Sequence, residues 1–175
     1  SPRGEPGAAG QLLSVREVRG WAEVKIYGFA SDSLTNIWAG IGAGRWAVGA
    51  SDNPTFNKGR QTKAAKMPIG SFGILYCSET GCYTTPFVVY SHPDPEAVVS
   101  NIWADPWVLP FGIKPLGNPS RSMTVAEMKE LLPTVKERQI KNPLTHFITV
   151  QGNFAFQPSE ISEADWSVLI EKLAI

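Results

Sequence analysis

Three tryptophans stand where an indole ring could form the wall of a ligand-binding site. Trp46 follows a glycine-rich turn, and Trp103 and Trp107 lie in a proline-punctuated stretch that leads to Phe111. A loop tryptophan is costly to expose and needs something to cover it. We expect Trp46, Trp103 and Trp107 to meet as an aromatic box for a flat ligand, although each ring alone would suit the core equally well.

Polar side chains precede the first of these tryptophans and could read the edge of the same ligand. Ser31, Asp32 and Ser33 form a polar turn, and Asn36 follows in a short helical pattern. Hydroxyl, carboxylate and amide groups donate or accept hydrogen bonds in fixed directions. We expect Ser31, Asp32 and Asn36 to face the polar edge of the ligand, with Ser33 beside them.

A basic run follows and could contact phosphates. Lys58, Arg60, Lys63 and Lys66 lie between Ser51 and Met67, with no acid after Asp52. Such residues neutralise phosphates and supply salt-sensitive affinity that is blind to sequence. A solvated loop explains the run equally well. Arg121, in a Gly-Asn-Pro-Ser turn, is a weaker phosphate candidate.

Catalytic and metal-binding patterns are incomplete. Glu23 and Lys25 resemble the tail of a nuclease carboxylate motif, but no proline-aspartate pair precedes them. His92 and His146 lack partners at ligand spacing. The glycines from Gly40 to Gly44 follow a helical pattern, whereas a dinucleotide fingerprint needs them before a helix. We predict no enzymatic activity, no catalytic residues, no metal and no cofactor.

Size and composition indicate one globular domain. The chain has 175 residues, 16 glycines, 14 prolines and a formal net charge of zero, which excludes a uniformly basic surface but not a basic patch. We expect residues 1–18 to be a flexible segment and residues 19–175 to be the domain. No apolar run approaches the ~18 residues of a membrane span. The only cysteines, Cys77 and Cys82, fit free thiols beside a hairpin turn and a reducing, cytoplasmic compartment.

Hydrophobic patterns and turn residues predict a strand, a helix, a strand and then a meander of strands with helices laid on it. Trp21, Trp38 and Trp166 are assigned to the core. Strands are predicted at 21–27, 45–48, 71–77, 82–91, 107–116 and 146–156, with an edge or bulge at Pro86 and a loop over 51–67. A first helix is predicted to begin at an Asp32 or Ser33 cap and to be ended by Gly40, Gly42 and Gly44. A helical turn is predicted over 93–99, and two further helices from Thr124 to Leu132 and from Ser162 to about Leu173.

The stretch from Phe29 to Val48 resembles the YTH domain, a reader of N6-methyladenine, within the PUA-like group that includes EVE domains. In that family a serine-containing turn is followed by an asparagine that bonds the adenine ring, and a cage tryptophan comes ten residues later. Asn36 and Trp46 keep that spacing. The stretch from Trp103 to Trp107 is similar to a second family motif but is one residue shorter.

The resemblance implies an α+β, PUA-like (YTH/EVE-type) fold: a curled mixed sheet or barrel with helices packed around it. It also implies an aromatic cage, Asn36 donating to a ring nitrogen, and the Ala47 carbonyl accepting the remaining amine hydrogen. Ala30 replaces the usual basic residue before the serine, and the basic groove is muted. Beyond Leu116 the chain looks more like the N-terminal reading domain of McrB-type restriction complexes.

The function that follows is a non-catalytic module that binds nucleic acid and recognises a methylated base. N6-methyladenine flipped from DNA is the leading candidate, and a motor or nuclease would lie outside this chain. An RNA reader and an EVE-type reader of modified cytosine stay open, as do a module for methylated lysine and a nuclease. The compartment would be a prokaryotic cytoplasm, or the nucleus or cytoplasm of a eukaryote.

Overall fold

The structure is a computed structural model that describes residues 25–150 and 155–175. The expected flexible segment 1–18, the first part of the strand at 21–27 with its core residue Trp21, and the nuclease-like Glu23 therefore lie outside the described residues. So does the boundary at residue 19.

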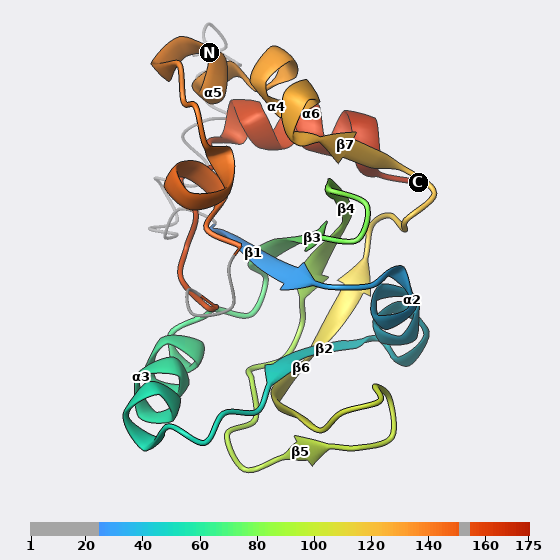
Figure 1. Ribbon diagram of the computed structural model, residues 1–175, viewed down its shortest axis with the longest axis vertical. Helices are drawn as coiled ribbons and strands as arrows, with labels where there is room; N and C mark the ends of the chain where they lie inside the picture. Colours follow the sequence, from blue (N-terminus) through green and yellow to red (C-terminus); the bar gives the residue numbers. More distant parts are fainter. Residues whose placement is uncertain (1–24, 151–154) are drawn as a thin grey trace, which may run out of the picture.

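A curled, seven-stranded sheet forms the centre of the molecule (Figure 1). Its strand order is β1-β3-β4-β6-β2, with β5 paired to β6 and β7 paired to β4. Among the described strands, β1 and β3 run parallel to each other, and the other pairs are antiparallel. The strands are β1 (Ile26–Ser31), β2 (Arg45–Gly49), β3 (Phe72–Cys77), β4 (Cys82–Val89), β5 (Val98–Val99), β6 (Trp107–Pro115) and β7 (Ser122–Thr124).

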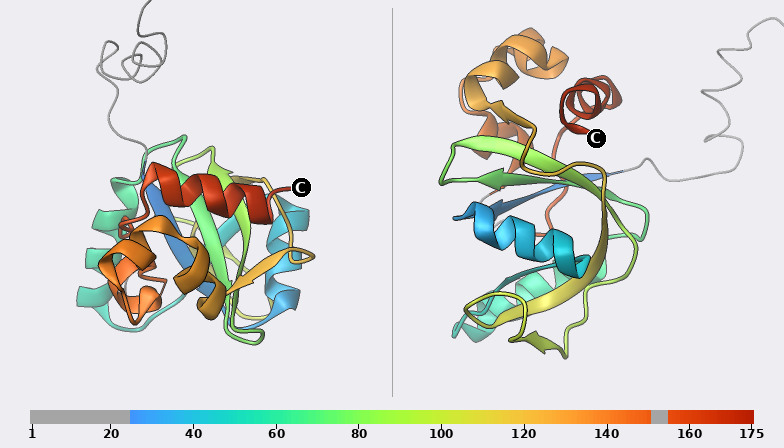
Figure 2. Two further views of the ribbon diagram at one scale, coloured as in Figure 1. Left: turned by 90° about the horizontal axis from the view of Figure 1, so that it is seen from above. Right: turned by 90° about the vertical axis from the view of Figure 1, so that its right-hand side faces the viewer.

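The helices lie on both sides of this sheet. Helices α4, α5 and α6 cover one face, over β3 and β4, whereas α2 and α3 stand at opposite ends of β2 (Figures 1 and 2). Their bounds are α2 (Leu34–Ala43), α3 (Pro54–Ala65), α4 (Val125–Leu131), α5 (Pro133–Arg138), the π-helical turn η1 (Leu144–Ile148) and α6 (Glu163–Leu173).

Two apolar clusters fill the space around the sheet. One lies inside the curl and includes Phe29, Trp46, Phe87 and Phe111. The other lies between the sheet and the α4–α6 layer and includes Tyr83. Burial of this apolar surface supplies most of the stabilisation of the fold.

Local signals around α2 explain where that helix begins and ends. Ser33 is the N-cap, and its Oγ accepts a hydrogen bond from the Asn36 N–H. Glu79, in the β3–β4 turn, accepts from the Leu34 N–H at 2.9 Å. Gly44 ends the helix with φ +66°, a conformation that glycine adopts without steric cost. The prediction that Gly40 and Gly42 also stop the helix is wrong, because both lie inside it.

Strand β4 contains a bulge at the point where it changes partner strands. Two residues, Thr85 and Pro86, lie opposite the single residue Ile74 of β3, and Thr85 has φ +54°. The half of β4 before the bulge pairs with β7, and the half after it pairs with β6. Pro86 has no N–H to give to a ladder, so a bulge suits it. The bulge predicted at Pro86 is therefore present.

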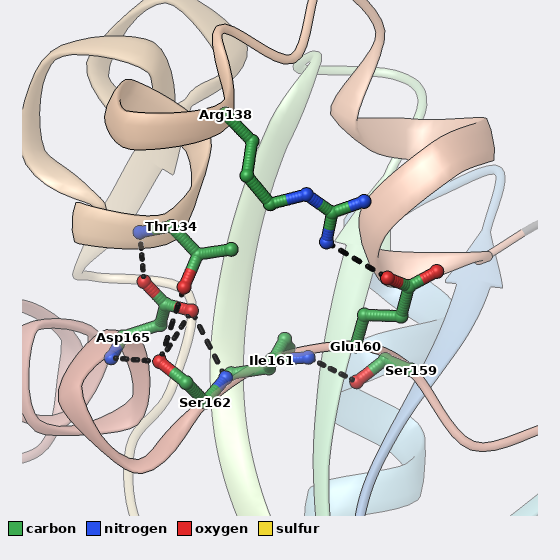
Figure 3. A network of polar contacts seen from close by, with 7 residues as sticks. All are labelled: Thr134, Arg138, Ser159, Glu160, Ile161, Ser162 and Asp165. Atoms are coloured by element: carbon green, nitrogen blue, oxygen red, sulfur yellow. Dashed lines mark hydrogen bonds and ion pairs between the residues drawn. The ribbon is translucent and has the colours of Figure 1, made fainter.

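One carboxylate ties the last two helices together (Figure 3). Asp165 is fully buried, and its Oδ2 accepts from the N–H (2.9 Å) and Oγ (2.7 Å) of Ser162, which completes the predicted capping box of α6. Its Oδ1 accepts from the Thr134 N–H at 2.8 Å. Helix α5 has no capping side chain of its own, so Asp165 serves both helices.

Several predicted elements match the structure. These are the strand after Gly44, the hairpin of β3 and β4, the strand at Trp107 and the capping box from Thr124 to Glu127. Cys77 and Cys82 are free, buried and directly opposite each other beside the turn, as expected.

Other elements differ from the prediction. The loop at 51–67 is helix α3, capped by Asn53 with Pro54 in its first turn. Residues 93–99 end in the short strand β5 rather than in a helical turn, and the strand predicted from His146 begins as η1. Trp38 is 48% exposed and so is not a core residue, whereas Trp166 is partly buried and stacks on Phe72 at 4.8 Å.

Candidate nucleic-acid interface

The indole rings of Trp46, Trp103 and Trp107 meet, although they come from distant parts of the chain. The centroid of Trp46 lies 5.7 Å from that of Trp103 and 5.3 Å from that of Trp107, and both contacts are edge-to-face. Trp103 and Trp107 are parallel to within 11° and stack at 4.3 Å. Such aromatic pairs are worth ~0.5–1.5 kcal/mol each beyond the area that they bury.

The slot between the two parallel rings is closed. A flat base between them would need a ring contact of ~3.5 Å on each side, or about 7 Å in all, against the observed 4.3 Å. Trp103 is also held in place, since it is 4% exposed and its Nε1–H donates to the Asn36 carbonyl oxygen at 2.9 Å. The space for a ligand therefore lies elsewhere around these rings.

A cavity of about 310 Å³ opens beside Trp46 and Trp107. Its lining includes Ala47 from β2, Phe29 from β1 and Phe56 from α3, but not Trp103. Pockets for small ligands begin at ~300 Å³ and are mostly apolar with a few placed polar groups. The planes of Trp46 and Trp107 are 82° apart, so a flat ligand could lie against the face of only one of them.

The backbone on one side of the cavity is irregular. Opposite Ala47, strand β6 carries two residues, Leu109 and Pro110, and Leu109 has φ +57°. Pro110 has no N–H to donate across the ladder. The register therefore skips Ala47, the residue whose carbonyl the family resemblance assigns to the ligand.

The predicted polar readers lie at the start of α2 and do not line the cavity. Ser31 is buried and its Oγ donates to the Ser33 carbonyl at 2.9 Å. Asp32 is exposed and accepts from Asn36 Nδ2 at 3.2 Å, and Ser33 caps the helix. Of the eight residues predicted to bind the base, only Trp46, Ala47 and Trp107 line the cavity.

The basic run is divided by its helical conformation. Lys58, Lys63 and Lys66 are exposed, on or just after α3, where they remain candidate phosphate contacts. Arg60 is only 7% exposed, because it lies on the inner side of the helix. Arg60 is therefore set apart from the exposed lysines, and its predicted contact with a phosphate stays a prediction.

Arg60 instead forms part of the cavity wall. Its guanidinium carbon lies 4.8 Å from the ring centroid of Phe56, one turn earlier in α3, and both residues line the cavity. Nε is buried without a hydrogen-bond partner. Removal from water disfavours the charged form and lowers the pKa of Arg60. The sequence offered one signal for this pair, an aromatic residue and an arginine at i, i+4.

Arg121 lies far from this cavity. It donates to the Ala174 carbonyl at 2.7 Å, close to the C-terminus and to β7, whereas α3 is at the other end of the molecule (Figure 1). His92 and His146 are both exposed. Over residues 25–150 and 155–175, no group of three His, Cys, Asp or Glu side chains could hold a metal ion. None of the helices in the same ranges is long and apolar enough to cross a bilayer.

The fold is α+β with a curled half-barrel sheet, and this is the fold of YTH domains. The MmI1 YTH domain is similar over 84% of this chain and 96% of its own, with a TM-score of 0.52 and 13% sequence identity. The YTH domain of Zygosaccharomyces rouxii MRB1, solved with N6-methyladenosine RNA, aligns over 66% of this chain and 75% of its own, with a TM-score of 0.45 and 18% identity. By sequence, the chain matches no protein-family model and no curated protein.

Proposed function

We propose that this chain is a non-catalytic module that binds a methylated base flipped out of its strand into the cavity beside Trp46 and Trp107. N6-methyladenine in DNA is the leading candidate. The observation that carries the proposal is a base-sized cavity walled by two tryptophans, on a fold of the YTH type. The spacing of Asn36 and Trp46 resembles that of the YTH family, which reads N6-methyladenine, and this is the reason for proposing that modification.

The cavity offers a base three kinds of contact. One indole face supplies stacking, worth ~1–3 kcal/mol per base. The Ala47 carbonyl accepts the amine hydrogen that methylation leaves on N6, and the skipped register at Ala47 is consistent with that role. Flipping a base costs a few kcal/mol, and a methyl group packed on an aromatic face helps to offset that cost.

Asn36 contributes to the base only if the tryptophan stack opens. Its carbonyl accepts from Trp103 Nε1–H, one N–H of its side-chain amide donates to Asp32, and the residue does not line the cavity in this conformation. Separation of Trp103 from Trp107 would create the slot that the family resemblance implies. The cavity beside Trp107 would take a base without that movement.

The exposed lysines of the α3 segment hold the strand. Lys58, Lys63 and Lys66 project from the segment that also contributes Phe56 and Arg60 to the cavity. They neutralise phosphates and add affinity that does not depend on the modification. The host we propose is a prokaryotic, modification-dependent restriction system in which a separate motor or nuclease acts on the DNA.

One set of titrations tests the proposal. The probes are oligonucleotides of a single sequence as DNA and as RNA, each with N6-methyladenine, 5-methylcytosine or no modification, at fixed salt. Tighter binding of the N6-methyladenine DNA than of its unmethylated twin supports the proposal. A preference for the RNA or for 5-methylcytosine would identify a different ligand for the same site. Equal binding of all probes would refute the base-reading function.

A further inference from the structure

Arg60 is a buried charge with no charged partner among the described residues. It is 7% exposed, and no acidic side chain in the described ranges forms an ion pair with it. Its Nε has no hydrogen-bond partner, although arginine carries five N–H donors that are usually satisfied when buried. An arginine with a purely structural role would be expected to use those donors inside the protein.

Arg60 also lies at the wall of several cavities. Its side chain lines the 310 Å³ cavity and also two neighbouring cavities of about 130 Å³ each. The contact with the Phe56 ring holds the guanidinium against an aromatic wall of the main cavity. Among the described residues that line this cavity, Arg60 is the only charged one.

We propose that Arg60 is a base-reading residue, whose guanidinium donates to a ring nitrogen on the buried edge of the bound methylated base. This inference rests on the proposed function and deepens it. Arginine has donors and no acceptor, so it cannot take the N6 hydrogen of methyladenine. The two residues would therefore contact different groups of the base. The Ala47 carbonyl would accept from the N6 amine, and an Arg60 N–H would donate to a ring nitrogen.

Adenine offers three such acceptors, at N1, N3 and N7. Each can be removed singly in a deaza analogue, in which a C–H group replaces that nitrogen. The free N6-methyladenine nucleosides are the right probes because they carry no phosphate, so any effect of Arg60 on them cannot come from the DNA backbone. Quenching of tryptophan fluorescence reports their binding.

The test combines Arg60→Met with the deaza series. Methionine keeps an unbranched side chain but removes the charge and every donor. We expect Arg60→Met to weaken binding of the N6-methyladenine nucleoside by about 10- to 100-fold, the range for a hydrogen bond to a charged group. One deaza analogue should bind the wild-type protein more weakly than the N6-methyladenine nucleoside does, by a similar factor. Arg60→Met should bind that analogue and the N6-methyladenine nucleoside equally. Arg60→Lys, which keeps a donor, should recover part of the loss.

Two controls separate base reading from charge and from folding. Lys129→Met removes an exposed positive charge on α4 and should leave nucleoside binding unchanged. The thermal unfolding midpoint of Arg60→Met should equal or exceed that of the wild type, because the substitution removes an unpaired buried donor. A lower midpoint would show that Arg60 stabilises the fold and would overturn the inference.

Different results would refute the proposed function and the proposed role of Arg60. If wild-type protein binds methylated and unmethylated nucleosides equally, the base-reading function itself is lost. If the wild type prefers the methylated form and Arg60→Met keeps both the preference and the affinity, the function stands and the role of Arg60 is refuted. A loss in Arg60→Met that appears only with oligonucleotides would identify a phosphate contact and would also refute it.

Discussion

Removal of the Trp107 ring is the cleanest perturbation of the proposed site. Trp107 lines the cavity and is only partly buried, whereas Trp46 is 1% exposed inside the core. Truncation of a buried tryptophan to alanine costs ~3–5 kcal/mol and threatens the fold. With Trp46→Ala, weaker binding could result from unfolding of the protein and not from loss of a ligand contact. Trp107→Ala is therefore the better variant.

The expected sizes of the two effects of Trp107→Ala can be worked from its contacts. The ring forms two aromatic pairs, with Trp46 and with Trp103, so the free energy of unfolding should fall by at least about 1–3 kcal/mol, since the lost apolar burial adds to these pairs. That leaves a domain of ordinary stability, ~5–15 kcal/mol, folded. Loss of one stacking face should weaken methylated-base binding by ~1–3 kcal/mol, or about 5- to 150-fold in Kd.

Trp38→Ala is the matched control, since it removes an exposed tryptophan on α2 that does not line the cavity. Urea unfolding measures the stability of both variants, and fluorescence anisotropy with methylated and unmethylated oligonucleotides measures binding. Trp38→Ala should keep the wild-type ratio of the two affinities. If a folded Trp107→Ala also keeps it, the base does not contact that ring and the cavity is not the reading site.

Three further predictions test other parts of the structure. Lys63→Ala should weaken methylated and unmethylated strands by one factor and lower the salt slope of binding by about one unit; a change in their ratio would contradict the phosphate role. The pKa of Glu127 is lowered chiefly by its hydrogen bond with Lys172, so Glu127→Gln should destabilise the protein near neutral pH but not once acid protonates the carboxyl. Urea unfolding should show this difference shrinking below about pH 4.5, and a constant difference would contradict it. Gly73→Ala places Cβ against the buried Phe87 ring and should lower the free energy of unfolding by ~1–3 kcal/mol, measured by thermal unfolding, whereas unchanged stability would contradict that close contact.

Most strands and capped helices could be predicted because their signals are local. Ser33, Thr124 and Ser162 each cap a helix through a side-chain oxygen three residues before the N–H that it accepts. The alternation of apolar residues in β3 and β4 and the turn between them are likewise contained in one short stretch.

The errors occur where distant contacts decide. Helix α3 has little apolar periodicity, and its inner face is formed by Arg60 and Ala64, so composition suggested a solvated loop. Short α5 depends on Asp165, thirty-one positions away from the Thr134 N–H that it accepts. Trp38 fits the apolar spacing of α2, yet it is 48% exposed.

The site was predictable in its tryptophans but not in its shape. The family resemblance implied that Trp46, Trp103 and Trp107 would come together, but it carries no information on ring orientation in this chain. Only the coordinates show that two rings stack on each other and that the open space lies beside one of them. Arg60 was missed as a cavity residue because burial of a charge in a basic run is not a local property.

The magnitudes suggest how affinity and selectivity are divided. In the closed conformation a flipped base would meet the face of one indole, worth ~1–3 kcal/mol, which roughly equals the few kcal/mol that flipping costs. Stacking alone therefore leaves little net binding. A hydrogen bond from the Arg60 guanidinium, at ~1.5–3 kcal/mol, would make insertion favourable, and it would do so only for a base that presents an acceptor to α3. The exposed lysines of that segment can add affinity but cannot distinguish a methylated strand from a plain one. Under the proposed function, selectivity would come from the cavity and affinity from the helix surface, so variants of the two should alter binding independently.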